Sequence, residues 1–239
     1  MSFDFRFLTA GESAVVVEFG NTIDENINAR VHLLASYCKS AAAPLGIVEL
    51  TPTYRSLLII FDPAVTARKN IINAIEKYFS ENGHAFENAV LPETAKTVEI
   101  PVLYGGEYGP DIETVAKYND ISKDEVIKIH CAATYKVYML GFLPGFPYLG
   151  GMDEKIACPR LEIPRTIVPA GSVGIAGGQT GVYPVDSPGG WQLIGKTPLA
   201  IFDVCRERPF LLKPGDSIVF KPIDRETFAA ISSIKAVRA

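Results

Sequence analysis

The 239-residue sequence lacks the features that mark membrane, secreted and nucleic-acid-binding proteins. No apolar run approaches the roughly 18 residues of a membrane span, and Asp4 and Arg6 interrupt the start, where a signal peptide needs an apolar core. Lys and Arg number 23 against 27 Asp and Glu, and the net charge of −4 gives no basic surface for nucleic acid or anionic lipid. We therefore expect a cytoplasmic protein with no nucleic-acid partner and no membrane partner.

Cysteine and histidine are too few and too scattered for a local metal site. No C-x-x-C pair and no His-Glu metalloprotease spacing occurs, so we expect no metal ion and reduced thiols. The residues concerned are Cys38, Cys131, Cys158, Cys205, His32, His84 and His130.

The first 90 residues alternate between a period of two, typical of strands, and spacings of three and four, typical of helices with one buried face. A T-x-x-E capping box at Thr22 and Glu25 predicts where the first helix begins, and Pro63 predicts the start of the second. The order ββαββα predicts a ferredoxin-like α+β domain, with two helices on one face of an antiparallel sheet. These elements depend on Phe3, Phe5 and Phe7, Ala14 to Phe19, Ile23, Ile27, Val31, Leu34 and Cys38, Ile47 to Leu50, Leu57 to Phe61, and Ile72, Ile75 and Phe79.

Glycine changes the character of the second half. Twelve of the 20 glycines lie between Gly141 and Gly195, interleaved with short apolar alternations, and this pattern predicts an all-β barrel for residues 91–239, after an α+β domain of residues 1–90. The predicted strands are Val98 to Leu103, Ser172 to Ala176, Gly181 to Tyr183, Gly190 to Ile194, Leu199 to Phe202 and Ser217 to Pro222, and the predicted short helices are Pro110 to Tyr118, Ser122 to Ala133 and Arg225 to Ile231.

The segment Gly190 to Thr197 matches the phosphate-loop pattern G-x-x-x-x-G-K-[ST]. A phosphate loop must lead into a helix whose N-terminus faces the anion, whereas Trp191 and its neighbours are strand residues and Pro198 leads into another apolar stretch. We interpret the match as accidental. Lys196 remains a candidate for an isolated contact with a phosphate.

An aromatic loop, Gly141 to Gly151, contains Phe142, Phe146 and Tyr148 together with two prolines. Proline fixes φ and glycine permits unusual turns, so the loop is stiff and suits the lining of a cleft or the gripping of a partner. The alternative is a hydrophobic lid over one end of the barrel. Trp191 is a further candidate for the same surface.

Two arginines, Arg160 and Arg165, follow prolines in one rigid segment. Guanidinium groups pair with carboxylate or phosphate, so these arginines either bind an anionic substrate or pair with Glu162 or another acid of the fold. The glycine turn that contains Gly177, Gly178 and Gln179 lets backbone approach a ligand closely, which makes these three residues candidate phosphate contacts.

Asp186 and His130 are the candidate catalytic residues. Asp186 lies before a Ser-Pro-Gly turn, where it either caps the turn or acts as a carboxylate base. His130 lies beside Ile127 and Ile129 in a predicted helix, where it is either a packing residue or a base. No nucleophile elbow and no papain-type cysteine context occurs in the sequence.

A long motif run resembles one bacterial family, for which the B subunit of 5-oxoprolinase, allophanate hydrolase subunit 1 and a sporulation-kinase inhibitor are alternative names. The N-terminal half resembles the family in its Gly11 to Ala14 and Phe19-Gly20 segments. The run comprises Tyr138 to Gly151, Pro159-Arg160, Pro164-Arg165, Ala170 to Gly177, Tyr183-Pro184 and Ser187 to Trp191.

The resemblance implies a small α+β domain followed by a cyclophilin-like β-barrel, and cleavage of 5-oxo-L-proline to L-glutamate with ATP as co-substrate. It also implies the C and A subunits of 5-oxoprolinase as partners, so that the active site is shared and this chain is inactive alone. A lactam is a poor electrophile, and phosphorylation of its oxygen would activate it. In that scheme Arg160, Arg165 and Lys196 hold the developing charge, and Asp186 or His130 accepts a proton.

Two other functions follow from related chains. One is inhibition of a sporulation sensor histidine kinase, in which the barrel and its aromatic loop grip a helical hairpin of the kinase. The other is a carboxyltransferase component of urea or allophanate metabolism.

Overall fold

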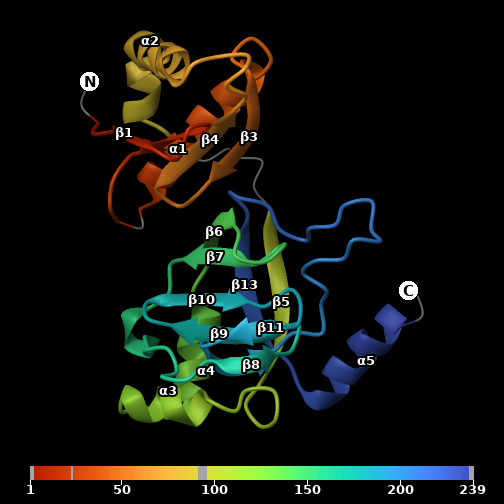
Figure 1. Ribbon diagram of the computed structural model, residues 1–239. Helices are drawn as coiled ribbons and strands as arrows, with labels where there is room; N and C mark the ends of the chain where they lie inside the picture. The colour runs from red at the N-terminus through yellow and green to blue at the C-terminus, as the bar shows by residue number, and fades with distance from the viewer. Residues whose placement is uncertain (1–2, 23, 91–95, 237–239) are drawn as a thin grey trace. The chain divides into compact units, whose positions relative to one another are not determined.

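The computed structural model describes residues 3–22, 24–90 and 96–236, with side chains described up to residue 233. Ile23 of the predicted first helix and most of the predicted boundary between the domains lie outside the described residues. The chain forms two compact units, Met1–Glu93 and Thr94–Ala239, each with its own core (Figure 1).

The N-terminal unit is a four-stranded sheet with two helices. The strands β1 and β2 form a hairpin, and β2 and β3 lie on either side of β4, antiparallel to it, in the order β1-β2-β4-β3. The elements are β1 (Arg6–Thr9), β2 (Ala14–Glu18), α1 (Glu25–Ser40), β3 (Ile47–Pro52), β4 (Ser56–Phe61) and α2 (Arg68–Glu87).

The ferredoxin-like layout predicted from the sequence is wrong. A ferredoxin-like domain has the element order βαββαβ, with two helical crossovers between strands of one sheet. Here only α1 connects two parallel strands, β2 and β3, while the chain beyond α2 does not return to this sheet. Periodicity identifies strands and helices, but it does not say which strands become neighbours.

Apolar side chains from both helices and from the strands form the N-terminal core. Val31, Leu34 and Cys38 of α1 are fully buried, as the helical spacing predicts. The helix begins differently from the prediction, because the Asp24 side chain accepts the hydrogen bond from the amide of Ile27 and is the N-cap in place of Thr22. The second helix begins at Arg68, five residues after the predicted Pro63.

The C-terminal unit contains most of the strands. Its elements are β5 (Thr97–Tyr104), α3 (Ile112–Tyr118), α4 (Lys123–Ala132), β6 (Tyr135–Leu140), β7 (Pro147–Gly150), the 3-10 helix η1 (Glu154–Ile156), β8 (Arg165–Val168), β9 (Ser172–Ala176), β10 (Gln179–Val182), β11 (Ser187–Gly189), β12 (Gln192–Lys196), β13 (Ser217–Pro222) and α5 (Arg225–Ala236).

Seven of these strands form one mixed sheet in the order β10-β9-β12-β5-β13-β6-β7. The central pair β5 and β13 is parallel and the other pairs are antiparallel. The end strands β7 and β10 approach each other, so the sheet curls into a nearly closed barrel (Figure 1). A separate two-stranded ribbon, β8 and β11, projects from it.

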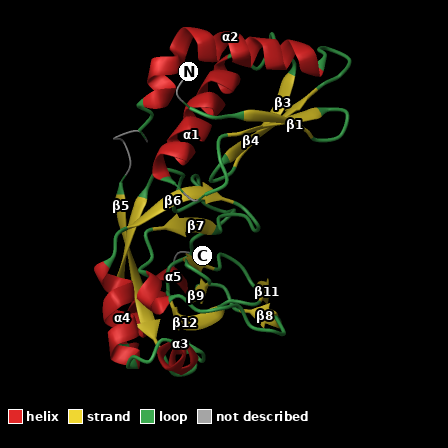
Figure 2. Ribbon diagram, turned by 90° about the vertical axis from the view of Figure 1, so that its left-hand side faces the viewer, coloured by secondary structure: helices red, strands yellow, loops and turns green. Residues whose placement is uncertain are grey.

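The predicted all-β class is wrong for this unit, although its short helices α3, α4 and α5 lie close to the positions that the sequence predicts. Helices α3 and α4 pack against β12 and β13, and α4 runs alongside the long strand β5 (Figure 2). The parallel β5–β13 pair needs a long connection, and the helices and further strands between Tyr104 and Ser217 provide it. The Ser122 side chain caps α4 by accepting from the amide of Glu125, as the S-x-x-E motif predicts.

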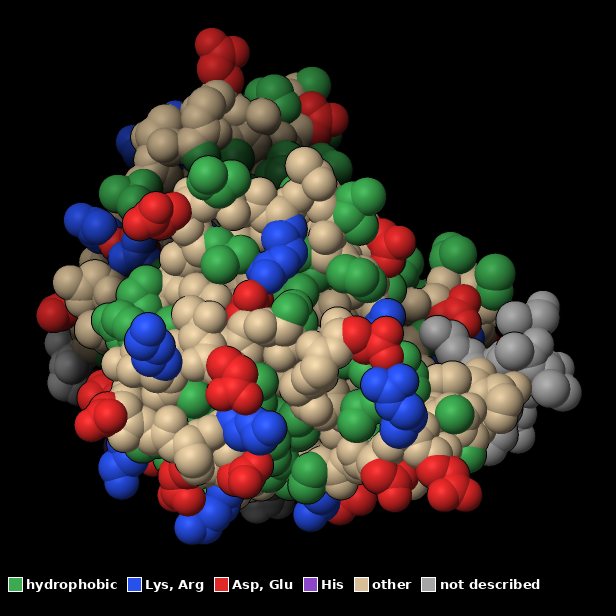
Figure 3. All heavy atoms as spheres, turned by 90° about the horizontal axis from the view of Figure 1, so that it is seen from below, with side chains coloured by type: hydrophobic (Ala, Val, Ile, Leu, Met, Phe, Trp, Pro, Cys, Tyr) green, Lys and Arg blue, Asp and Glu red, His purple; other side chains and the backbone are tan. Residues whose placement is uncertain are grey.

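The helices of the described residues are too short or too polar to cross a membrane. The surface carries charges of both signs. On the face drawn in Figure 3, acidic and basic side chains are interspersed with apolar ones and neither sign forms a continuous field. This distribution fits the small net charge of −4.

Candidate functional site

The aromatic side chains predicted to form a cleft come together at the edge of the barrel, near the junction of β7 and β10. Phe146 is the centre of the group, with its ring centroid 5.4 Å from those of Tyr148, Tyr183 and Trp191, all in edge-on geometry. These rings line a pocket of about 220 Å³ together with Phe142, Arg160, Gly189 and Gly190.

Two glycines allow this packing. A Cβ atom added at Gly181 would lie 2.9 Å from the Phe146 ring and 3.2 Å from the Trp191 ring. A Cβ added at Gly189 would lie 2.4 Å from the Tyr183 hydroxyl oxygen. Part of the glycine enrichment therefore serves ring packing at the pocket.

The loop before β7 carries an aromatic ring at the edge of the pocket. Phe142 has φ of 66°, in the left-handed region that non-glycine residues rarely adopt, and it is 64% exposed. Two backbone hydrogen bonds close the loop, from the amide of Gly141 to Phe146 O (3.1 Å) and from the amide of Phe146 to Leu143 O (3.0 Å). Gly145, with φ of 84°, makes the turn between them.

Arg160 lines the pocket, is exposed, and has a hydrogen-bonded residue on each side of it. The amide of Leu161 donates to Gly190 O (2.7 Å), and Gln192 Nε2 donates to Pro159 O (2.9 Å). Among the residues that the structure describes, Arg160 has no hydrogen bond or ion pair, and the predicted alternative partner Glu162 does not pair with it. Its guanidinium is exposed and available to an anion.

Arg165 takes the second of its two predicted alternatives, a pair with an acid of the fold. Its Nη2 pairs with Asp111 Oδ1 at 2.7 Å, and its Nη1 donates to Trp191 O at 3.4 Å. The other carboxylate oxygen of Asp111, Oδ2, accepts from the buried amide of Leu193 at 2.6 Å. These bonds therefore fix the start of β12 and Trp191, the residue directly before it.

Asp111 and Tyr183 are the two site residues that the sequence reasoning missed. Tyr183 belongs to a recognised motif, Tyr183-Pro184, but nothing in the strand pattern marks it as a pocket wall. Burial raises the pKa of the Tyr183 hydroxyl, while the Trp191 backbone, Arg160 and Arg165 act in the opposite direction. Both arginines therefore act on the Tyr183 hydroxyl, although the charge of Arg165 is paired with Asp111.

His130 belongs to α4, is fully buried and is not one of the residues that line the pocket. The Thr180 hydroxyl donates its proton to Gly174 O (3.0 Å), so Thr180 Oγ1 must accept the hydrogen bond from His130 Nε2–H (2.9 Å). The other ring nitrogen, His130 Nδ1, then accepts from the Tyr104 hydroxyl (2.7 Å). Complete burial lowers the pKa of His130 to about 3. Both ring nitrogens are occupied and the low pKa keeps the ring neutral, which fits the packing interpretation of His130.

The remaining predicted residues are dispersed. Asp186 Oδ1 accepts from the amide of Ala170 (2.7 Å) and so ties two loops together. Lys196 lines a second pocket of about 270 Å³ and lies 5.9 Å from the centre of the Tyr108 ring. Gly177 and Gly178 form the exposed turn between β9 and β10, and Gln179 begins β10.

The phosphate-loop match is accidental, as the sequence analysis concluded. Residues Gln192–Lys196 form β12, and Pro198 follows without a helix. The stretch Leu199 to Phe202 is not a strand either, apart from one isolated bridge between Phe202 and Phe210. Within the described residues, no three His, Cys, Asp or Glu side chains gather into a group that could hold a metal ion.

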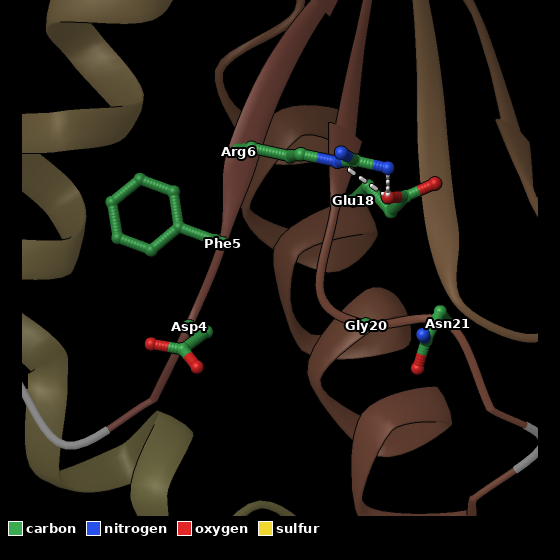
Figure 4. A pocket seen from close by; sticks show the side chains of 6 residues that line it. All are labelled: Asp4, Phe5, Arg6, Glu18, Gly20 and Asn21. Atoms are coloured by element: carbon green, nitrogen blue, oxygen red, sulfur yellow. Dashed lines mark hydrogen bonds and ion pairs between the residues drawn. The ribbon is translucent and has the colours of Figure 1, made fainter.

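A further pocket, of about 260 Å³, lies in the N-terminal unit (Figure 4). In Figure 4 the Arg6 side chain extends toward Glu18, whereas Phe5 points to the opposite side. The buried Glu18 carboxylate pairs with both Arg6 (2.5 Å) and Arg55 (3.3 Å). Because these charges satisfy each other, the aromatic pocket with its unpaired Arg160 is the stronger candidate site.

The fold and the pocket thus describe a two-unit α+β protein whose C-terminal unit carries a small pocket lined by aromatic rings. Residues 5–212 match the family described as carboxyltransferase domain, subdomain C and D, and the chain belongs to this family.

Proteins with assigned names match over nearly the whole chain. The B subunit of 5-oxoprolinase from Bacillus subtilis is 46% identical over 96% of this chain and 98% of its own length, and that from Escherichia coli O157:H7 is 42% identical over 91% of this chain and 95% of its own length. These relatives confirm the resemblance drawn from the motif run. The urea amidolyase of Saccharomyces cerevisiae is 32% identical over 91% of this chain, which corresponds to 13% of that protein.

Two solved structures are similar to this chain over most of its length. A conserved uncharacterized protein from Pyrococcus horikoshii is 49% identical, with a TM-score of 0.55 over 93% of this chain and 100% of that chain. The urea amidolyase of K. lactis has a TM-score of 0.78 at 26% identity, over 97% of this chain and 16% of that chain.

Proposed function

We propose that this chain is the B subunit of an ATP-dependent 5-oxoprolinase, which cleaves the lactam C–N bond of 5-oxo-L-proline with water to give L-glutamate. The observation that carries the proposal is the 46% identity to the B subunit of a 5-oxoprolinase over almost the full length of both chains. A protein that is one subunit of an enzyme has partner chains, and we propose that they are the C and A subunits of 5-oxoprolinase.

The geometry of the pocket supports a shared active site. The pocket offers rings and one free guanidinium, which are binding groups, whereas the two predicted proton acceptors are engaged elsewhere. Asp186 caps a loop and His130 is buried and neutral. A partner chain would then supply the general base, and this chain would be inactive alone.

We assign ATP as a co-substrate that the partner chains bind. The Gly190 to Thr197 segment, whose sequence resembles a nucleotide loop, contains the strand β12 and lacks the helix N-terminus that would hold a phosphate. Activation of the lactam oxygen by phosphoryl transfer would take place where the two chains meet. We place the complex in the cytoplasm.

The test is reconstitution. This chain is purified alone, its partners are purified without it, and the two are then combined, while ADP release is followed with 5-oxo-L-proline, with urea and with no substrate. We expect release that requires 5-oxo-L-proline and all the chains. Full turnover by this chain alone would refute the shared site, and turnover of urea in place of 5-oxo-L-proline would refute the substrate.

The urea reaction is a second candidate because the K. lactis urea amidolyase matches 97% of this chain with a TM-score of 0.78. In that case the chain would act as a carboxyltransferase component, and the same assay with urea separates the two functions. Inhibition of a sensor histidine kinase stays a prediction from the resemblance. Titration of this chain against a kinase dimerisation domain tests it, and absence of binding at micromolar concentration would exclude it.

A further inference from the structure

The size of the aromatic pocket selects for a small ligand. Its volume of about 220 Å³ is below the roughly 300–1,000 Å³ of sites for drug-sized molecules. Phe146, Tyr183 and Trp191 are at most 7% exposed, so the rings of the inner wall are held in place by packing. An apolar cavity of about 150 Å³ holds benzene, so these walls can enclose a single small ring with one substituent.

The charge of the pocket selects for an anion. Of the residues that line the pocket, Arg160 carries a positive charge and none carries a negative charge. The nearby Arg165 is neutralised by Asp111 at 2.7 Å, which leaves the Arg160 guanidinium to balance a ligand charge. A guanidinium pairs with a carboxylate through two parallel hydrogen bonds, and apolar walls favour an anion with an apolar body over a fully hydrated phosphate.

The conformation of Phe142 indicates that the loop is built for contact with a ligand. A non-glycine residue in the left-handed region costs about 1–2 kcal/mol, and such strain is concentrated at ligand-binding loops. The Phe142 ring lies 5.6 Å from that of Phe146, edge to face, although it is 64% exposed. The strained backbone therefore holds an exposed ring over the pocket instead of burying it in the core.

From these observations we propose that the aromatic pocket is a recognition site for a five-membered ring that bears a carboxylate, in which Arg160 binds the carboxylate and the rings of Phe142, Phe146 and Trp191 enclose the ring. The identity of the ligand as 5-oxo-L-proline rests on the proposed function. The selectivity for the carboxylate rests on the pocket alone.

Trp191 provides a direct assay, because it is the single tryptophan of the sequence and lines the pocket. The full chain, alone and in complex with its partners, is titrated with 5-oxo-L-proline, with cyclopentanecarboxylate and with 2-pyrrolidinone while tryptophan emission is recorded. The second compound keeps the carboxylate but not the lactam, and the third keeps the lactam but not the carboxylate. We expect both carboxylates to change the emission at millimolar or lower concentration, and 2-pyrrolidinone to bind at least tenfold more weakly.

Arg160→Gln tests the role of the guanidinium, and Arg208→Gln is the matched control, because Arg208 is exposed and does not line the pocket. Loss of a charged hydrogen bond corresponds to about a 10- to 100-fold weaker affinity. We expect this loss for both carboxylates in Arg160→Gln, an unchanged affinity for 2-pyrrolidinone, and no change in Arg208→Gln. In the active complex, Arg160→Gln should raise KM for 5-oxo-L-proline by the same factor and leave kcat unchanged.

The outcomes separate this proposal from the proposed function. If the complex does not cleave 5-oxo-L-proline but cyclopentanecarboxylate still binds in an Arg160-dependent way, the function is wrong and the site stands. If the complex turns over with the same KM in Arg160→Gln, the function stands and the site is wrong. Equal affinity for 2-pyrrolidinone, or no ligand-induced change in emission in either the chain or the complex, would also overturn the site.

Discussion

Replacement of Asp111 by alanine should destabilise the C-terminal unit, because this one carboxylate serves two partners. Its Oδ2 accepts from the buried amide of Leu193 at 2.6 Å, and its Oδ1 pairs with Arg165 at 2.7 Å. A buried amide left without an acceptor costs about 1–3 kcal/mol. The ion pair adds about 1 kcal/mol, since the Arg165 side chain is 28% exposed and water screens the interaction.

We therefore expect Asp111→Ala to lower the free energy of unfolding by about 2–4 kcal/mol. Asp111→Asn keeps an oxygen for the Leu193 amide and loses only the charge, so it should cost about 1–2 kcal/mol. Asp124→Ala, an exposed aspartate in the first turn of α4, is the control and should stay within about 0.5 kcal/mol of the wild type.

Urea unfolding followed by tryptophan emission measures these differences, because the single tryptophan lies in the C-terminal unit, two residues before Leu193. A loss below about 1 kcal/mol for Asp111→Ala would refute the reasoning, since the Leu193 amide would then have found another acceptor or water. Equal losses for the alanine and asparagine variants would show that the charge, and not the amide acceptor, carries the stability.

Two further predictions use the same unfolding assay. Burial lowers the pKa of His130 to about 3, whereas His130 in the unfolded chain takes up a proton near pH 6.5. Between these two values only the unfolded chain binds the proton. The free energy of unfolding should therefore fall as the pH is lowered from 6.5 toward 3, by up to about 1.4 kcal/mol per pH unit. His130→Gln should remove this pH dependence and the exposed His84→Gln should retain it; equal slopes in the two variants would contradict the assignment. Gly181→Ala should cost about 1–3 kcal/mol and shift the emission of Trp191, because the added Cβ meets two rings. Gly178→Ala, with open space around the added Cβ, should do neither, and a native-like spectrum for Gly181→Ala would show that the rings move aside without difficulty.

Local sequence signals located many elements but not their arrangement. The β9 strand (Ser172–Ala176) and the β13 strand (Ser217–Pro222) have the predicted limits, and the cap of α4 at Ser122 was readable from four residues. Alternation and capping are local properties of the chain, so they can be read from the sequence alone. The predicted ferredoxin-like layout failed because strand order joins residues far apart in the sequence, and the all-β class failed because helices pack against the sheet of the C-terminal unit.

The sequence by itself determined which residue types are available at the pocket. These are an aromatic loop, two arginines that each follow a proline, and many glycines, which allow close packing. The tertiary structure decided which of them act together. Arg160 and Arg165 look equivalent five residues apart, yet one faces the pocket free and the other is paired with Asp111, a residue 54 positions away. That choice depends on which strands curl toward each other when the barrel closes, and this depends on the packing of the whole unit and not on any local pattern.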